Sequence, residues 1–139
     1  MQAKVGSIQT LLPEGWPRPP GYSQGIAARG RCIFAAGQVG WDSAGRFQSS
    51  HFADQVEQAL KNILAILDVA GARPEHVVRL IWYITSRDEY NGQLAEIGAK
   101  YRAVMGKHFP AMSVVQVVAL MESAAKVEIE ATAVIPEES

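Results

Sequence analysis

The chain has a single cysteine, Cys32, and its 13 basic and 14 acidic residues leave a net charge of only −1. One cysteine excludes an intrachain disulfide framework. No basic stretch is present, which disfavours nucleic acid as the main partner, because clustered lysines and arginines bind phosphate backbones. No apolar run reaches the roughly 18 residues of a membrane span, and the N-terminus lacks the basic and apolar segments of a secretion signal. We therefore expect a cytoplasmic protein that contacts neither a membrane nor nucleic acid.

What the chain does contain is 48% hydrophobic and 19% charged residues over a length of 139. This balance is typical of a globular protein, and the length fits one domain with a substantial core. Neither an internal repeat nor a linker divides the sequence. We predict a single domain that spans residues 1–139.

Prolines and glycines organise the N-terminal part of the chain. Residues 11–22 hold four of the seven prolines, which favours an ordered, extended loop because proline fixes φ and lacks an N–H donor. Two short strands are expected next, over 24–28 and 31–36. The Arg29-Gly30 pair between them predicts a β-hairpin.

A long amphipathic helix is predicted over 52–67, where apolar residues recur every three to four positions. Gly71 stands where a C-terminal cap belongs. Ser49 or Ser50 is the expected N-cap, since a serine hydroxyl can accept a hydrogen bond from a free N–H group of the first turn.

Three further strands and a second helix complete the prediction. The β-branched run 77–84 and the segments 111–120 and 126–135 predict strands, and the spacing over 90–104 predicts a helix that ends near Gly106. We predict the order β-β-β-α-β-α-β-β, in which one of the three strands before the first helix is not assigned a residue range. This is an α+β fold with a mixed sheet and two helices on one face. The other face carries apolar residues such as Val114, so we expect self-association to cover it.

The last of these strands alternates between two kinds of side chain. Glu128 and Glu130 lie two residues apart and share one face, while Val127 and Ile129 lie on the other. The apolar face packs on a core. The face with two carboxylates must meet water, a partner subunit or a substrate.

Five stretches of the chain resemble the RidA/YjgF family of small enamine and imine deaminases. They are Gly-Tyr-Ser-Gln-Gly at 21–25, Ala-Gly-Gln-Val-Gly at 36–40, the segment 55–62, Phe-Pro-Ala at 109–111, and Val-Glu-Ile-Glu-Ala-Thr-Ala at 127–133. They occur in family order across most of the sequence.

The resemblance implies a chorismate-mutase-like fold and a homotrimer. Three sheets would form a central barrel, with a cleft for a small-molecule metabolite at each subunit interface. It also implies that the protein uses no metal and no organic cofactor. The implied reaction is hydrolysis of a 2-aminoacrylate-like or aminomuconate-like enamine or imine, with release of ammonia. Other members have been described as ribonucleases or translation inhibitors.

The resemblance also assigns roles to individual residues. Tyr22 would line the cleft and reach the substrate with its hydroxyl, the backbone at Gly37 would donate an N–H, and Glu128 would position and activate water. In the family, an arginine after Phe-Pro-Ala holds the substrate carboxylate, but here the residue is Met112. The serine that is often found before the glycine is Ala36.

The missing arginine changes the expected ligand. An arginine–carboxylate fork makes two charge-assisted hydrogen bonds of roughly 1.5–3 kcal/mol each, and losing even ~3 kcal/mol weakens binding about 100-fold. A further polar contact is absent because Gly98 stands where the family usually has asparagine. Met112 therefore favours a larger or less acidic ligand, unless Arg18, in the loop before Tyr22, supplies the missing cation.

Two more residues complete the candidate site. If the last two strands pair about a turn near Glu122, Gln116 lies across from Glu128 and can orient it. Trp41 follows a strand near the expected cleft. It is either a platform for a ligand or a packing residue at the subunit interface.

Three functions are compatible with these residues. Hydrolysis of a C=N bond needs a proton donor and a base for water, and one partly buried carboxylate, Glu128, can serve both steps in turn. A binding protein of the same fold would hold a carbonyl or aromatic metabolite without turnover, which Met112 favours. A ribonuclease is disfavoured by the near-neutral charge. His51, His76 and His108 lie far apart and lack the spacing of metal ligands.

Overall fold

The structure is a computed structural model that describes residues 4–5 and 8–137. It confirms the predicted α+β class. The elements in chain order are β1 (Lys4–Val5), β2 (Ile8–Leu11), β3 (Gly25–Ala28), β4 (Arg31–Val39), α1 (Phe52–Val69), a 3₁₀ turn (Pro74–His76), β5 (Val77–Ile84), α2 (Arg87–Gly92), α3 (Leu94–Met105), β6 (Ala111–Gln116) and β7 (Val127–Ile135).

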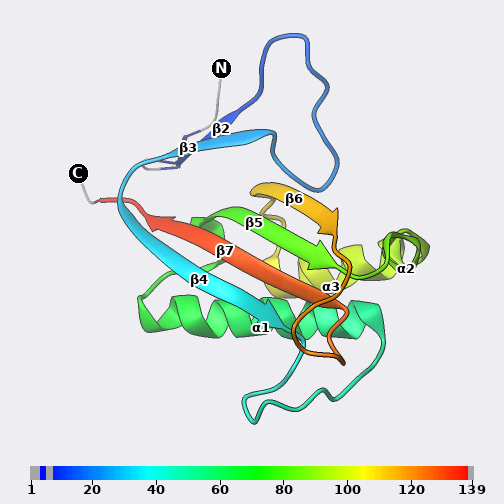
Figure 1. The fold of residues 1–139 in the computed structure, drawn as a ribbon. Coiled ribbons are helices and arrows are strands. Elements are labelled where there is room, and N and C mark those ends of the chain that lie inside the picture. Colours follow the sequence, from blue (N-terminus) through cyan, green and yellow to red (C-terminus); the bar gives the residue numbers. More distant parts are fainter. Residues whose placement is uncertain (1–3, 6–7, 138–139) are drawn as a thin grey trace.

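A four-stranded mixed sheet with the order β4-β7-β5-β6 forms the centre of the fold. Strand β7 is antiparallel to both β4 and β5, whereas β5 and β6 are parallel. A parallel pair needs a long crossover connection, and here α2 and α3 supply it. Figure 1 shows α1 and α3 on the same side of the sheet, as predicted.

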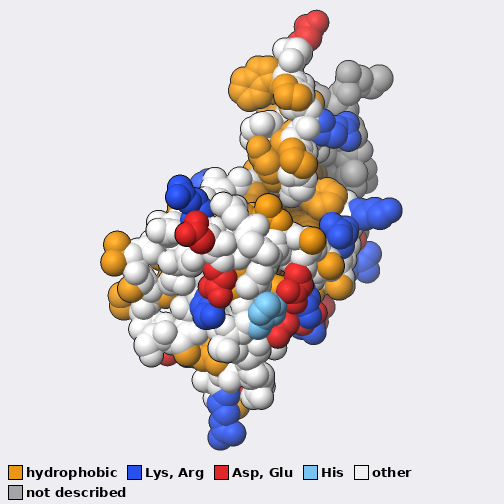
Figure 2. Space-filling model, turned by 90° about the vertical axis from the view of Figure 1, so that its right-hand side faces the viewer, with side chains coloured by type: hydrophobic (Ala, Val, Ile, Leu, Met, Phe, Trp, Pro, Cys, Tyr) orange, Lys and Arg blue, Asp and Glu red, His pale blue; other side chains and the backbone are white. Residues whose placement is uncertain are grey.

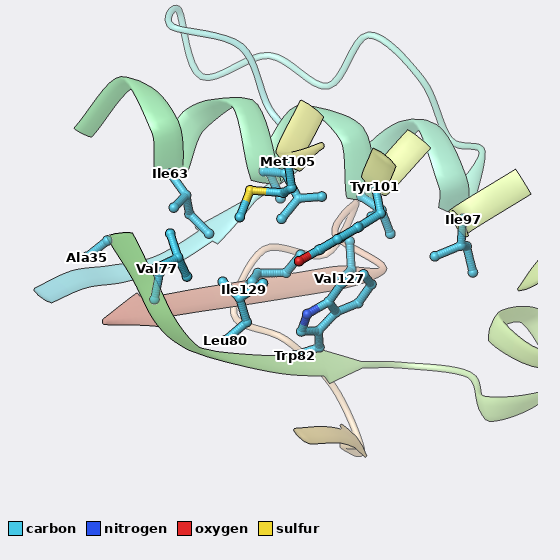
Figure 3. Close-up of a cluster of buried hydrophobic side chains, with 14 of the residues drawn as sticks. Ala35, Ile63, Val77, Leu80, Trp82, Ile97, Tyr101, Met105, Val127 and Ile129 are labelled. Atoms are coloured by element: carbon cyan, nitrogen blue, oxygen red, sulfur yellow. The ribbon is translucent and has the colours of Figure 1, made fainter. Parts of the chain in front are cut away.

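The core lies between this sheet and its helices. Alternation along the strands turns Leu80 and Trp82 of β5, and Val127 and Ile129 of β7, toward the helices, and all four are buried. Figure 3 shows these side chains meeting Tyr101 and its neighbours from the helical layer. The helix-covered face of the sheet therefore supplies the apolar burial that stabilises the domain.

The opposite face, which we call the open face, is covered by no helix in the described part of the chain. Its outward side chains include Phe34, 75% exposed, and Val115, 44% exposed. Val114, which was expected on this face, instead packs against the core on the helix side, opposite the buried Trp82. The same face carries the half-buried Glu128 and Glu130. Exposed large apolar side chains mark surfaces that meet another molecule, which agrees with the expected self-association, although the trimer itself stays a prediction.

The N-terminal strands form an arm beyond the edge strand β6. Strands β1, β2 and β3 make a separate three-stranded sheet, and a parallel bridge from Ser23 to Ala111 joins the arm to the beginning of β6. Hydrophobic side chains gather on the projecting arm in Figure 2. Leu11, in β2, and Trp16, in the segment between β2 and β3, are 36% and 54% exposed. The arm is therefore a second apolar surface of the isolated chain.

The predicted hairpin between residues 24–28 and 31–36 is wrong. Strand β3 pairs with β2, whereas β4 pairs with β7. Gly30, with φ of 149°, carries the chain from one sheet to the other, and a Cβ there would overlap the carbonyl of Ile135. The spacing of the two segments indicates a bend but does not specify the partner of either strand, because burial of each face selects the pairing.

The predicted pairing of the last two strands is also wrong. Strand β6 pairs with β5, and β7 lies between β4 and β5, so β5 separates the two. Strand β6 ends at Gln116 and not at 120. The segment 117–126 is a long loop from the edge of the sheet back to its centre.

Local signals located the helices better than they located the caps. Helix α1 ends as predicted, with Gly71 in the left-handed conformation at φ of 80°. Its N-cap is His51, and neither Ser49 nor Ser50. The Ser49 hydroxyl instead donates to the Asp54 carboxylate at 2.8 Å.

The predicted second helix is two helices, because Gln93 interrupts it between α2 and α3. The side-chain oxygen of Gln93 accepts a hydrogen bond from the Ala53 N–H at 3.1 Å, which ties this break to the first turn of α1. Gly106, with φ of 70°, ends α3 at the predicted place. None of the described helices is both long and apolar enough to cross a bilayer.

Candidate active site

Strand β7 places two carboxylates at the centre of the open face. Glu128 and Glu130 are both half-buried, and the residues between and beside them on the chain, Val127, Ile129 and Ala131, are buried under the helices. Two residues along a strand span about 7 Å, so the two carboxylates are neighbours on one surface. The sequence alternation predicted this arrangement.

Gly37 lies directly beneath one of these carboxylates. A Cβ at position 37 would overlap the carboxylate of Glu128, so only glycine leaves the acid its place. The pairing of β4 with β7 shifts between Ala35 and Gln38, which puts both Ala36 and Gly37 in a β-bulge. Bulges unpair backbone groups locally and often lie next to active sites. The glycine and the glutamate that the resemblance singled out are therefore in contact.

Tyr83 adds a third polar group that the sequence analysis missed. In the register of β5 with β7, Tyr83 is directly opposite Glu128, and its hydroxyl donates a hydrogen bond to the Glu130 carboxylate. Strand alternation over 77–84 could have found it, because Leu80, Trp82 and Ile84 are the buried set and Tyr83 falls between them. We call Gly37, Tyr83, Glu128 and Glu130 the carboxylate cluster.

Tyr83 titrates differently from a free tyrosine. The hydrogen bond to Glu130, loss of water contact and the negative charges of Glu130 and Glu128 raise the pKa of its hydroxyl, while the positive charge of Arg79 opposes this rise. The neutral phenol is thus the form that the cluster favours, and it acts as a donor.

Tyr22 and Met112 lie at a different place, along the edge strand β6. The Ser23 N–H donates to the Pro110 carbonyl at 3.0 Å, and the Ser23 hydroxyl donates to the Phe109 carbonyl at 2.5 Å. These bonds fix the loop that carries Tyr22 beside the Phe-Pro-Ala-Met segment. Tyr22 is 36% exposed. The structure therefore brings Tyr22 close to the beginning of β6, through the contacts of Ser23 with Phe109, Pro110 and Ala111.

One chain does not unite Met112 with Glu128. Met112 is paired with the buried Leu80 of β5 and packs against the core, so it lies on the helix side of the sheet, whereas Glu128 is on the open face. The two residues are also two strands apart, which is about 10 Å. A site that uses both of them needs a second copy of the chain.

Gln116 does not lie across from Glu128. It is paired with Ile84 at the end of β6, and its side-chain oxygen accepts a hydrogen bond from the Arg87 N–H at 2.6 Å, at the first turn of α2. The proposed orientation of Glu128 by this residue depended on pairing of the last two strands, so within one chain it is wrong. Tyr83 occupies the position that was assigned to Gln116.

The remaining candidates are near the ends of these elements. Trp41 is half-buried and packs on Phe47 with ring centroids 5.8 Å apart. Arg18 is exposed in the loop before Tyr22. The structure tests neither the platform role of Trp41 nor the cation role of Arg18, and both stay predictions.

Helix α1 holds the end of β4 and the long loop in place. Asn62 donates through its amide nitrogen to the carbonyls of Val39 and Trp41, at 3.1 and 2.8 Å. The buried Gln55 donates to the carbonyls of Ser49 and Ala124, at 3.1 and 3.0 Å, and its oxygen accepts from the Lys126 N–H at 2.8 Å. These residues are structural supports for the strands that carry the carboxylate cluster.

Two hollows of about 180 and 350 Å³ lie around Ser49 and Gln55, and both are open to solvent. Neither is lined by Glu128 or Met112, so they do not enclose the carboxylate cluster. No group of three histidine, cysteine or acidic side chains is placed to hold a metal ion within residues 4–5 and 8–137.

Known proteins resemble this chain over most of its length. Residues 17–135 match the family described as endoribonuclease L-PSP. The 2-iminobutanoate/2-iminopropanoate deaminase of Homo sapiens is 33% identical over 114 residues, which cover 81% of this chain and 79% of that protein. The protein of the same name from Salmonella typhimurium is 30% identical over 130 residues, covering 91% and 97%.

A solved structure extends this likeness to three dimensions. The crystal structure of YyfB from Yersinia pestis, described as a conserved Rid-family protein of unknown function, superposes with a TM-score of 0.81 at 32% sequence identity. The superposition covers 93% of this chain and 99% of that chain.

Proposed function

Since this chain belongs to the endoribonuclease L-PSP family, which includes the RidA/YjgF proteins, we propose that it is a hydrolytic deaminase of a small enamine or imine. The single observation that carries the proposal is the contact between the half-buried Glu128 carboxylate and the bulge at Gly37. The names of the human and Salmonella relatives point to the same class of substrate.

The reaction adds water to a C=N bond and then breaks the C–N bond. Glu128 takes a proton from the attacking water, the water oxygen bonds to the imine carbon, and the nitrogen receives the proton through the same carboxylate. Collapse of the resulting carbinolamine releases ammonia and leaves a carbonyl group. A backbone N–H freed by the bulge at Gly37 supplies a hydrogen bond to a substrate oxygen.

The site is composed of two copies of the chain. The edge of one copy, at Tyr22 and the beginning of β6, would meet the open face of another copy, because a single copy separates Met112 from the carboxylate cluster by two strands. Met112 is only half-buried, so the part of its side chain that the core leaves exposed would contact that site. The exposed Phe34 and Val115 supply apolar area for that contact. A homotrimer closed around a barrel is the assembly that the family resemblance implies.

Met112 sets the substrate preference that we expect. A thioether at this position gives no charge-assisted bond to a carboxylate, so small imino acids bind weakly and a larger or less acidic enamine, such as an aminomuconate-like compound, binds better. A Met112→Arg variant is expected to raise kcat/KM for 2-aminoacrylate by up to about 100-fold. This factor corresponds to ~3 kcal/mol of binding free energy, the upper end of the range for one charge-assisted hydrogen bond.

The experiment is a coupled assay of ammonia release from freshly generated 2-aminoacrylate and from 2-aminomuconate. Glu128→Gln is expected to lower kcat/KM at least about 100-fold, as removal of a general acid–base does. Glu122→Gln, in the exposed loop between β6 and β7, is the matched control and keeps wild-type activity. Equal activity of the wild-type protein and Glu128→Gln would overturn the proposed role of the carboxylate.

The second candidate is a binding protein of the same fold. The observation that favours it is Met112, which leaves the edge of the site without a cation. Saturable binding of a carbonyl or aromatic metabolite without ammonia release from either substrate would select this function. A ribonuclease is disfavoured because the net charge of −1 supplies no basic surface for phosphates.

A further inference from the structure

Tyr83 is on the open face of β5, beside the strand that carries both carboxylates. Its backbone is opposite Glu128 in the pairing of β5 with β7, but its hydroxyl donates to Glu130, one pleat further along β7. Residues that are diagonal across two strands are within reach of an aromatic side chain. Tyr83 is therefore the register partner of one acid, Glu128, and the hydrogen-bond donor of the other, Glu130.

The groups that surround the two acids come from the other three strands of the sheet. Strand β5 contributes Tyr83 and, further along the same face, the exposed Arg79. On β4 the titratable group of this face is Cys32, which is opposite Val134 near the far end of β7. The residues of β4 and β6 that are closer to the acids and face outward are uncharged, namely Phe34, Ala36, Gly37, Ser113 and Val115.

We propose that Tyr83 is a positioning residue that holds Glu130 by a hydrogen bond and offsets part of its charge, so that Glu128 is the carboxylate that exchanges protons with the substrate. This assignment rests on the proposed deaminase function and names a device of the same site. The hydrogen bond from Tyr83 gives the two carboxylates different roles: Glu130 is a fixed hydrogen-bond acceptor, and Glu128 carries the proton.

The physical basis is the distance between like charges. The backbones of Glu128 and Glu130 are about 7 Å apart along β7, and both side chains leave the strand on the same half-buried face, so each acid is a like charge in the surroundings of the other. A hydroxyl that donates to one of them spreads its negative charge and so weakens the repulsion that the other experiences. Glu130 cannot take the proton-carrying role as readily, because its oxygen is already engaged by Tyr83.

The test compares the pH profiles of kcat/KM for the wild-type protein, Tyr83→Phe and Glu130→Gln. Loss of the hydroxyl leaves Glu130 an uncompensated anion beside Glu128, so the acidic limb of the profile moves to higher pH by about half a unit, a change of ~3-fold in proton affinity. Loss of the Glu130 charge moves the same limb to lower pH. The double variant behaves like Glu130→Gln, because Tyr83 acts through Glu130.

The matched control is Tyr90→Phe. Tyr90 is half-buried on the helix side of the sheet, where it packs against Phe52 and Trp82, so its hydroxyl is remote from the acids and the profile is expected to stay in place. A merely structural role for Tyr83 would lower stability or raise KM without moving the limb. An unmoved limb in Tyr83→Phe, or movement in the same direction in both single variants, would overturn the proposal.

A second measurement does not depend on turnover. NMR titration of the side-chain carboxyl carbons reports the pH midpoint of the signal from position 128 in each variant. We expect this midpoint to rise in Tyr83→Phe and to fall in Glu130→Gln. If the wild-type protein releases no ammonia but these midpoints move as expected, the deaminase function fails and the positioning role stands. If ammonia is released but the midpoints stay fixed, the positioning role fails alone.

Discussion

The two faces of the four-stranded sheet are made by the same strands, yet they differ in almost every property. On the helix side, Leu80 and Ile129 are completely buried. On the open side, Phe34 of β4 is three-quarters exposed, and Glu128 and Tyr83 form part of a polar cluster. Each of these three residues is next along its strand to a buried residue of the helix side. Period-two alternation lets one backbone serve both purposes. The helix side fixes the strands, and the open side is free to carry charge.

The difference also explains why the carboxylate cluster can be ordered without being enclosed. The backbone of β7 is hydrogen-bonded on both edges, to β4 and to β5, and its inward side chains are packed against α1. The outward side chains of such a central strand inherit a fixed position. Edge strand β6, with one described neighbour over most of its length, holds Met112 less tightly.

The largest expected effect comes from truncating the helix side. Leu80→Ala removes a fully buried side chain and is expected to lower the free energy of unfolding by about 2–5 kcal/mol. Ile81→Ala, on the adjacent residue of the open side, is expected to cost about 1 kcal/mol. Urea denaturation followed by circular dichroism measures both. Equal losses for the two variants would contradict the comparison of the faces.

The same pair can sharpen the comparison if it is measured at two protein concentrations. A second copy that covers the open face adds burial to Ile81 but not to Leu80. The unfolding midpoint of Ile81→Ala should then fall further behind the wild type as the concentration rises, whereas the deficit of Leu80→Ala stays constant.

The next effect concerns what covers the open face. Phe34→Asp places a charge at a large apolar side chain of the open face that is 75% exposed, and we expect the dissociation constant of the assembly to rise at least about 100-fold, because a desolvated charge without a partner is costly. Val69→Asp changes a side chain that is 90% exposed at the end of α1. It should leave assembly unchanged in sedimentation velocity. An unaltered assembly in Phe34→Asp would place the subunit contact elsewhere.

The fold could be predicted from sequence where the signal was local. The strand over 77–84 and the glycine caps at Gly71 and Gly106 are where the pattern placed them, because alternation and left-handed turns depend on neighbouring residues. Strand partners were predicted wrongly for β3, β4, β6 and β7. Pairing depends on burial of both faces of the whole sheet, which no single segment encodes.

Predictions of where the site residues lie were likewise correct where they depended on local sequence and wrong where they depended on strand pairing. The resemblance brought Glu128 and Gly37 together, and the bulge at Ala36 and Gly37 accounts for their contact. Gln116 was misplaced because its strand was given the wrong neighbour. Tyr83 was missed, although its outward position follows from alternation, because a tyrosine in an apolar run resembles core until its partner is known.

A smaller loss of stability is expected from changing Gln55, a polar residue in the otherwise apolar interior on the helix side. Gln55 is the one polar residue among the described buried side chains, and it bonds to the backbone at Ser49, Ala124 and Lys126. Gln55→Leu leaves these backbone groups without their partners and is expected to cost about 2 kcal/mol. Hydrogen exchange should accelerate in the loop at 117–126 before the sheet is affected.

The control for this variant is Gln58→Leu. Its amide donates to Asn62 one turn along the half-buried surface of α1, and such helix pairs contribute only about 0.2–0.5 kcal/mol. Matched losses in the two variants would mean that Gln55 is an ordinary helix residue and that the loop is held by other contacts.

The smallest effect is expected on the outer surface of the helical layer. Lys100 pairs with Asp54 at 3.3 Å and with Glu57 at 3.4 Å. The hydrogen bond from the Ser49 hydroxyl, followed by the contact with Lys100, lowers the pKa of Asp54. Its ionised form is therefore favoured by folding. That stability is present above the unfolded pKa, near 3.8, and is lost as the pH falls through the lower folded value.

Lys100→Met removes the cation from this group and keeps most of its apolar stem. We expect a lower unfolding midpoint near neutral pH, by less than in Leu80→Ala or Gln55→Leu, since exposed ion pairs are weak and screened by salt. The difference from the wild type should shrink below about pH 4 as the acids become protonated. It should also shrink in high salt. A difference that persists in acid would assign the role of Lys100 to packing of its stem and not to its charge.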